Sequence, residues 1–165
     1  MTREEFLKDI NNWSNYKYLL WPALQAVKGS SLPVVELGAG HGSTPLLRSF
    51  CKENGMEFFS YDNTREWAEK LGAEYVQEWD QSGLWAKQYS LCFIDMAPGE
   101  YRKKSLVKIK AEIIVIHDSE PAGWNQSDYQ VRPKFSRFKY VKDYESPGAW
   151  TTALSNTIDV TRWDV

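Results

Sequence analysis

A glycine-rich segment that follows a short apolar run is the first feature of this sequence with the potential for chemistry. Residues 34–44 read VVELGAGHGST, with Glu36 two positions before the first of three alternating glycines. Glycines let a chain turn sharply and bring backbone N–H groups close to a ligand, and the start of a following helix favours an anionic group. The dinucleotide-binding pattern G-x-G-x-x-G needs glycine at position 43, where this chain has Ser43. The segment therefore predicts a cofactor-binding loop that departs from the nicotinamide dinucleotide type.

Acidic residues and a histidine stand at the ends of three further apolar runs. They are Asp62 after residues 56–61, Asp95 after residues 89–94, and the pair His117 and Asp118 after residues 112–116. Ligands of open α/β sheets bind beyond the carboxyl ends of the strands, so these side chains are expected beside a common site. Asp95, His117 and Asp118 are the candidates for catalysis. Either Asp95 or His117 could act as a general base that removes a proton from a bound substrate.

The spacing of apolar residues predicts the elements that must position these groups. A helix is expected over residues 3–27, interrupted near Trp21 and Pro22 because proline starts or breaks helices. Strands are expected over residues 32–37, 56–61, 73–79, 89–94 and 112–116, helices over 45–51, 64–71 and 103–108, and a hairpin over 137–144 and 150–156. The predicted fold class is α/β: a three-layer, doubly wound, mostly parallel seven-strand sheet with helices on both faces and a C-terminal antiparallel β-hairpin.

Length and composition predict a single domain. The chain has 165 residues, of which 42% are hydrophobic and 25% charged, as expected for one globular domain with its own core. The single domain over residues 1–165 divides into an N-terminal helical segment (1–29), a cofactor-binding βαβ core (32–118), and an acceptor loop with the closing hairpin (119–165). No apolar run approaches the ~18 residues of a membrane helix, and no secretory signal is evident, so a cytoplasmic location without membrane contact is expected.

Charge is spread unevenly along the chain. The net charge is −2, which argues against non-specific nucleic-acid binding by the whole protein, so a nucleic-acid partner is not expected. Residues 102–142, however, contain 10 Lys and Arg residues against four acidic residues. Positive charge near a cleft attracts anions, so this segment favours a small anionic molecule as the substrate. The sequence leaves a homo-oligomer open.

The glycine segment resembles the first motif of the class I S-adenosylmethionine-dependent methyltransferases, a Rossmann-like family. The resemblance implies S-adenosylmethionine (SAM) as the cofactor. It implies that Asp62 and Asn63 lie at the ribose hydroxyls, that Trp79 and Asp80 contact adenine, and that Asp95 and Met96 face the sulfonium and the acceptor. The implied contacts from the first motif are Glu36, Gly38, Ala39, Gly40, His41, Gly42, Ser43 and Thr44.

The resemblance also bears on the acceptor. Residues 94–101, IDMAPGEY, are loosely similar to the D-x-A-P loop of polysaccharide O-methyltransferases, which favours a sugar-like acceptor. Asp95 and Asp118 could instead share a divalent cation, as in metal-dependent O-methyltransferases. That option is not favoured, because the usual Asp-Asn pair is here Asp118-Ser119. Trp124 and Tyr129 belong either to the acceptor pocket or to the core.

The function predicted from the sequence is therefore SAM-dependent methyl transfer to a small, anionic or sugar-like acceptor, at oxygen. Two alternatives stay open. The chain could be a non-catalytic cofactor-binding or scaffold module with a methyltransferase-like fold, or, less favoured because of Ser43, an NAD-type oxidoreductase.

Overall fold

The computed structural model describes residues 1–11, 14–124 and 129–165. Its centre is a seven-stranded sheet with the strand order β3-β2-β1-β4-β5-β7-β6. The strands are β1 (Val34–Leu37), β2 (Phe58–Asp62), β3 (Glu74–Tyr75), β4 (Gln88–Ile94), β5 (Lys110–His117), β6 (Tyr140–Tyr144) and β7 (Thr151–Ser155). The first five strands are parallel, and β7 lies antiparallel between β5 and β6. This arrangement confirms the predicted fold class.

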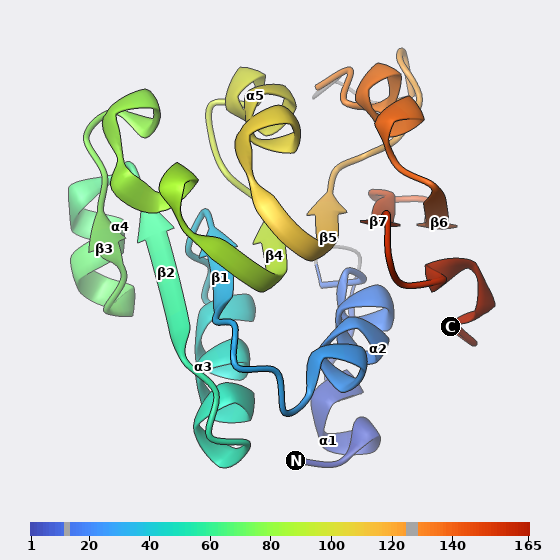
Figure 1. Cartoon of the computed structure of the whole chain (residues 1–165), viewed down its shortest axis with the longest axis horizontal. Helices are drawn as coiled ribbons and strands as arrows, with labels where there is room; N and C mark the ends of the chain where they lie inside the picture. Colours follow the sequence, from blue (N-terminus) through green and yellow to red (C-terminus); the bar gives the residue numbers. More distant parts are fainter. Residues whose placement is uncertain (12–13, 125–128) are drawn as a thin grey trace.

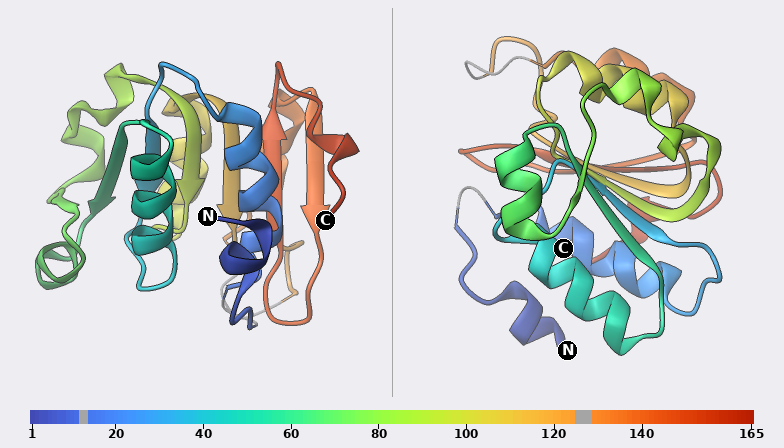
Figure 2. Two further views of the ribbon diagram at one scale, coloured as in Figure 1. Left: turned by 90° about the horizontal axis from the view of Figure 1, so that it is seen from below. Right: turned by 90° about the vertical axis from the view of Figure 1, so that its left-hand side faces the viewer.

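Helices cover both faces of the sheet (Figures 1 and 2). The helices are α1 (Arg3–Leu7), α2 (Lys17–Val27), α3 (Ser43–Glu53), α4 (Arg65–Leu71) and α5 (Glu100–Lys108), with short 3-10 turns η1 (Trp79–Gln81), η2 (Gly83–Ala86), η3 (Arg132–Arg137) and η4 (Val160–Arg162). The right-hand view of Figure 2 shows the sheet between α5 with the neighbouring 3-10 turns on one side and α1 to α3 on the other. The domain therefore has three layers.

Alternating side chains of the central strands build two separate cores. In β5, Ile113 and Val115 pack with α1 to α3, whereas Ile114 and Ile116 pack on the opposite face with α5 and the 3-10 turns. All four side chains are buried, as expected for a strand covered on both faces. The unbroken apolar run that predicted a central strand thus has its physical reason in this two-sided burial.

Several element boundaries differ from the sequence-based expectation. The N-terminal helix is interrupted after Leu7 and not near Pro22, which lies inside α2. Asp9 follows α1 with φ +57°, a left-handed conformation that Asp tolerates better than most residues and that ends the helix. The third strand is reduced to two residues, because the chain leaves the sheet and turns into η1 at Trp79. Trp13, which falls within the helix predicted over residues 3–27, lies outside the described residues.

The carboxyl ends of β1, β2, β4 and β5 meet at one edge of the sheet, where the arrowheads point in Figure 1. β7 starts at the same edge, since Thr151 pairs with His117. Candidate side chains from distant parts of the sequence are therefore brought to one edge. Within the described part of the chain, none of the helices has the length and apolar character that crossing a membrane requires.

Candidate functional site

The glycine loop crosses the end of β4 at very close range. Gly38 donates its N–H to the carbonyl oxygen of Tyr61 at 2.9 Å and has φ +93°. A Cβ at this position would collide with the backbone carbonyl of Asp95. At Gly42, a Cβ would stand 2.8 Å from the hydroxyl of Tyr16. Glycine is required at Gly38 because backbone blocks any side chain there, whereas at Gly42 the obstacle is the end of one side chain, that of Tyr16.

Glu36 is a fully buried carboxylate beneath this loop. Its Oε2 accepts hydrogen bonds from the hydroxyls of Thr44 at 2.7 Å and Ser60 at 2.6 Å. Its Oε1 is buried and has no hydrogen-bond partner. Burial raises the pKa of Glu36 to about 7, although hydrogen bonds from the serine and threonine hydroxyls oppose the shift. An unpartnered buried carboxylate oxygen beside a glycine loop suits a donor group of a bound ligand, such as the amino group of SAM.

A cavity of about 350 Å³ opens between the ends of β1, β2 and β4. Its lining residues are Ala39, Asp62, Asn63, Thr64, Trp67, Asp95 and Ala97. Asp62 accepts the backbone N–H of Ala39 at 3.0 Å and that of Thr64 at 2.7 Å, one with each carboxylate oxygen. Each oxygen keeps a second lone pair, so the fixed carboxylate can still accept a pair of ligand hydroxyls. Asp62 therefore both orders the turn before α4 and lines the cavity.

Trp67 is a cavity residue that the sequence analysis missed. Its indole N–H donates to the carbonyl oxygen of Ala39, and this bond fixes the ring at the cavity wall. His41 packs edge-on against Trp67 with ring centroids 4.6 Å apart, and is itself exposed. The available signal was an aromatic residue one turn into the helix after Asp62, but its apolar character predicted only helix packing.

Of the fourteen cofactor contacts implied by the family resemblance, Ala39, Asp62, Asn63 and Asp95 line this cavity. The other ten do not, among them Trp79, Met96 and Asp80. Trp79 is 1% exposed and packs in the core, with its indole N–H 3.1 Å from the carbonyl oxygen of Ala97. Met96 is also fully buried in that core. Asp80 is exposed and forms ion pairs with Lys104 and Lys108. The expected adenine contacts after the third strand are thus absent from the cavity lining.

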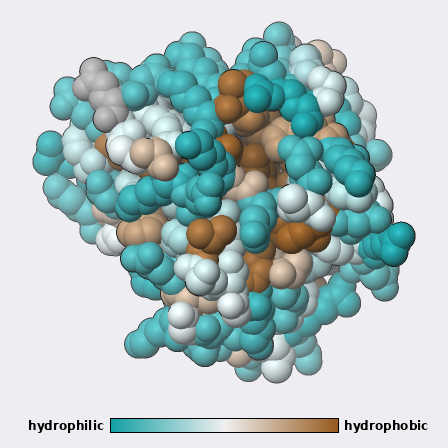
Figure 3. Space-filling view, viewed as in Figure 1, coloured by the Kyte–Doolittle hydropathy of each residue, from teal (hydrophilic) through white to brown (hydrophobic). Residues whose placement is uncertain are grey.

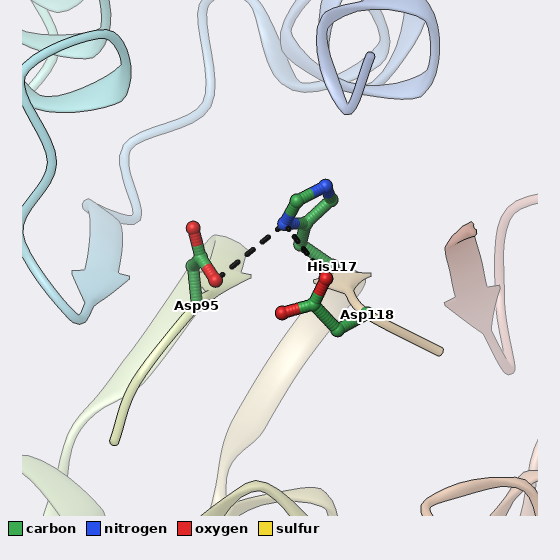
Figure 4. A group of neighbouring side chains, drawn as sticks. All are labelled: Asp95, His117 and Asp118. Carbon is green, nitrogen blue, oxygen red and sulfur yellow. Dashed lines mark ion pairs between the residues drawn. The ribbon is translucent and has the colours of Figure 1, made fainter. Parts of the chain in front are cut away.

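Asp95, His117 and Asp118 lie together at the ends of β4 and β5 (Figure 4). The Nδ1 atom of His117 is 3.5 Å from an oxygen of Asp95 and 3.6 Å from an oxygen of Asp118. The prediction that these three side chains share one place is therefore met by the geometry. Asp95 is 30% exposed and lines the cavity, whereas His117 is buried.

Arg102, which the sequence analysis also missed, ties this cluster together. Its side chain is only 4% exposed and donates to Asp95 at 2.9 Å and to Asp118 at 3.0 Å. It also donates to the carbonyl oxygens of Met96 at 2.8 Å and His117 at 2.6 Å. The guanidinium therefore fastens α5 to the ends of β4 and β5. In sequence it was one of many basic residues in the 102–142 segment.

The same cluster bears on the divalent-cation alternative. One ligand atom each from Asp95, His117 and Asp118 lies within 4.8 Å of the others, a spacing that could hold a metal ion. However, the guanidinium of Arg102 already pairs with both carboxylates and offsets one of their two charges, and arginine stays charged in proteins. A divalent cation beside it would meet a fixed positive charge. The donor set therefore fits an internal arginine better than a metal ion.

The surroundings of His117 favour its protonated form. Nδ1 faces the two carboxylates, and Nε2 lies 3.2 Å from the side-chain oxygen of Asn15. The Asn15 amide is oriented by its own N–H bond to the carbonyl oxygen of Ala149 at 2.7 Å. Both ring nitrogens thus face acceptors, which only the imidazolium can satisfy. Burial lowers the pKa of His117, but the hydrogen bond and charge of Asp95, with the charge of Asp118, raise it above its ordinary value overall.

This geometry separates the two candidates for the base. A buried histidine whose surroundings favour the imidazolium is a poor proton acceptor, whereas Asp95 faces the cavity. Burial raises the pKa of Asp95, but His117 and Arg102 more than compensate and hold it below its ordinary value. Asp95 is therefore an ionised hydrogen-bond acceptor directed at the cavity, and His117 supports it.

Solved structures share this architecture. No protein family and no curated protein matches the sequence. A SAM-dependent O-methyltransferase from Thermotoga maritima matches with a TM-score of 0.60 at 14% identity, over 94% of this chain and 70% of that one. The 16S rRNA methylase ArmA matches with a TM-score of 0.53 at 15% identity, over 94% of this chain and 91% of that one. The hMettl16 catalytic domain in complex with the MAT2A 3′UTR hairpin 6 matches with a TM-score of 0.52 at 15% identity, over 96% of this chain and 79% of that one. The chain therefore has the class I SAM-dependent methyltransferase fold.

These structures correct the expectation against a nucleic-acid partner. One protein with this fold is a 16S rRNA methylase, and another was solved with a hairpin of a 3′UTR. The expectation was drawn from the net charge of −2, which averages over the whole surface. Binding of a polyanion depends on the local distribution of charge, so the net charge alone does not exclude it.

Proposed function

We propose that this protein transfers the methyl group of SAM to an oxygen atom of an anionic acceptor presented to Asp95. The observation that carries the proposal is the cavity, which is lined by the carboxylates of both Asp62 and Asp95. A ligand bound there could contact both side chains. The unpartnered oxygen of Glu36, buried beneath the glycine loop, would receive the amino group of the cofactor. Asp62 would hold the ribose hydroxyls, and Trp67 would close the cavity wall.

The chemistry asked of the protein is modest. SAM supplies a methyl carbon that its sulfonium makes electrophilic, so the protein must chiefly position the acceptor in line. Asp95 would accept the hydrogen bond of the acceptor hydroxyl and so direct a lone pair of the oxygen. When the methyl carbon exchanges its bond to sulfur for a bond to the acceptor oxygen, S-adenosylhomocysteine would be left, and the hydroxyl proton, then strongly acidic, would pass to Asp95 and from there to water. Because the hydroxyl proton is strongly acidic at that stage, even a carboxylate of low pKa can accept it.

The neighbours of Asp95 keep it ready for this step. Arg102 and His117 hold its pKa down and fix its position. They offset the charges of Asp95 and Asp118, so the cluster has no net charge when His117 is protonated. The acceptor's own charge is proposed to be negative because of the cations in residues 102–142.

Calorimetric titration with S-adenosylhomocysteine tests the cofactor assignment. The wild type is expected to bind, and D62N should weaken binding about 10- to 100-fold, as loss of a charged hydrogen-bond acceptor costs about 1.5–3 kcal/mol. D80N is the matched control, because Asp80 is an exposed aspartate away from the cavity and should leave binding unchanged. Circular dichroism checks that both variants fold. Absence of binding to the folded wild type, or equal losses in both variants, would contradict the assignment.

A cofactor-binding module without transfer is the second candidate, and the low pKa of Asp95 favours it because such a carboxylate is a weak base. The variant D95N separates the two. If the protein is an enzyme, methyl transfer to an identified acceptor falls while S-adenosylhomocysteine still binds. If D95N changes no measured transfer, the proposed role of Asp95 is wrong.

A further inference from the structure

One side of the domain carries a concentrated set of cations, which we call the basic α5–η3 face. Its members are Lys103, Lys104 and Lys108 of α5, and Lys134 and Arg137 of η3. The two elements pack against each other above the sheet (Figures 1 and 2). In the space-filling view, hydrophilic residues dominate this upper region, and hydrophobic residues gather toward the middle of the molecule (Figure 3).

The face includes a hollow with an apolar floor. A depression of about 440 Å³ is lined by Glu100, Lys103, Lys104, Val107, Lys108 and Lys134. Val107 is 45% exposed among the lysines. Glu100 and Asp80 offset part of the charge through their ion pairs with Lys104 and Lys108. Five cations against two acids still leave a clear positive excess in a protein whose net charge is −2.

This face is directly connected to the candidate site. Arg102 lies on α5 with its side chain buried against Asp95 and Asp118, and the next residue, Lys103, belongs to the basic face. Opposite sides of one helix thus support the site and carry the cations. A long anionic ligand held on α5 therefore lies within one helix diameter, about 10 Å, of the reacting edge.

An exposed aromatic residue stands at the same edge. Trp124 follows β5 and is 52% exposed. It contacts Trp150 edge-on, with ring centroids 5.4 Å apart, and Trp150 precedes β7 at the end of the sheet that carries His117. The guanidinium of Arg132, the first residue of η3, lies 5.4 Å from the centre of the Trp150 ring. Trp124 is therefore linked through Trp150 to the start of η3.

We propose that the acceptor is a single-stranded nucleic acid whose phosphates lie along the basic α5–η3 face and one of whose bases stacks on Trp124. Single-stranded nucleic acids are bound by grooves of cations that follow the backbone, combined with aromatic side chains on which bases stack. An acidic protein segment would use the cations but would leave the exposed indole without a role. As a statement about the acceptor, this inference rests on the proposed function, although the binding surface itself does not.

Fluorescence anisotropy with a labelled 20-nucleotide single-stranded RNA, and with DNA of the same sequence, tests the surface. If five phosphates are neutralised, the logarithm of affinity should fall against the logarithm of salt concentration with a slope of about −3.5, or about 100-fold from 50 to 200 mM salt. Binding of either strand supports the proposed surface. Tighter binding of the RNA is expected, because its 2′-hydroxyl groups supply the oxygen that the proposed methyl transfer requires. Tighter binding of an acidic peptide than of either strand would overturn it.

Matched charge variants locate the surface. The triple variant K103Q/K134Q/R137Q should reduce the salt slope by about 2. The control K8Q/K28Q/K52Q removes the same charge from exposed positions in the α1 to α3 layer and should leave affinity nearly unchanged. W124A should weaken binding about tenfold without changing the slope. Equal effects of the two triple variants, or no effect of W124A, would overturn the proposal.

A second titration keeps the two proposals separate. The variant K103Q/K134Q/R137Q should still bind S-adenosylhomocysteine like the wild type, because none of the three side chains lines the cavity. If nucleic acid binds but S-adenosylhomocysteine does not, the proposed function fails and the surface stands. If S-adenosylhomocysteine binds and neither strand does, the inference about the acceptor fails and the proposed function stands.

Discussion

Replacing Arg102 by methionine should destabilise the protein strongly. Methionine fills much of the same space but leaves Asp95 and Asp118 without the guanidinium that holds both. Breaking a buried ion pair by removing one partner costs about 3–5 kcal/mol. The two carboxylates are 30% and 19% exposed, so water recovers part of that cost. We therefore expect a loss near the lower limit, about 3 kcal/mol.

Urea unfolding followed by circular dichroism measures this loss. With a slope of about 2 kcal/mol per M for a domain of this size, the midpoint should fall by about 1.5 M. R137M is the control, because Arg137 is exposed and its replacement should change stability by less than about 0.5 kcal/mol. Mg²⁺ should raise the midpoint of R102M but not that of the wild type, since carboxylates released from arginine are magnesium ligands. A loss below about 1 kcal/mol in R102M would refute the assignment of Arg102 as the link between the two strand ends.

Three further predictions follow from the same region. In an NMR titration His117 should show a pKa above 6.5. Its stabilising contribution should be complete below about pH 6.5 and lost as the pH rises through its folded-state pKa, and titration at or below 6.5 would count against the imidazolium. Burial raises the pKa of Glu36 to about 7, so folding stability should decline by up to about 1.4 kcal/mol per pH unit between pH 4.5 and 7. Thermal melts of E36Q should show a flatter dependence of stability on pH than those of the wild type. Identical pH dependences would disprove the shift. In urea unfolding, G38A should be destabilised by at least 2 kcal/mol more than G29A. Both glycines have positive φ, but only at Gly38 would a Cβ collide with backbone. Equal losses would show that the cost comes from the positive φ alone.

Much of the fold could be predicted from local sequence. The run of residues 113–116 is apolar without alternation because both faces of β5 are covered, and this pattern is visible in the sequence. The glycine loop was predictable for a similar reason, since the backbone approach at Gly38 demands glycine. Element boundaries, such as the short extent of the two-residue β3, could not be predicted, because they depend on where the chain leaves the sheet.

The sequence by itself determined the strand ends and hence the place of Asp62, Asp95, His117 and Asp118, because parallel strands bring their carboxyl ends to one edge. Only the tertiary structure decided what these groups do there. Arg102 is one of many cations in the chain until α5 packs on the sheet and buries it between two carboxylates. A side chain's charge state depends on burial and on partners that are distant in sequence, which no local pattern encodes.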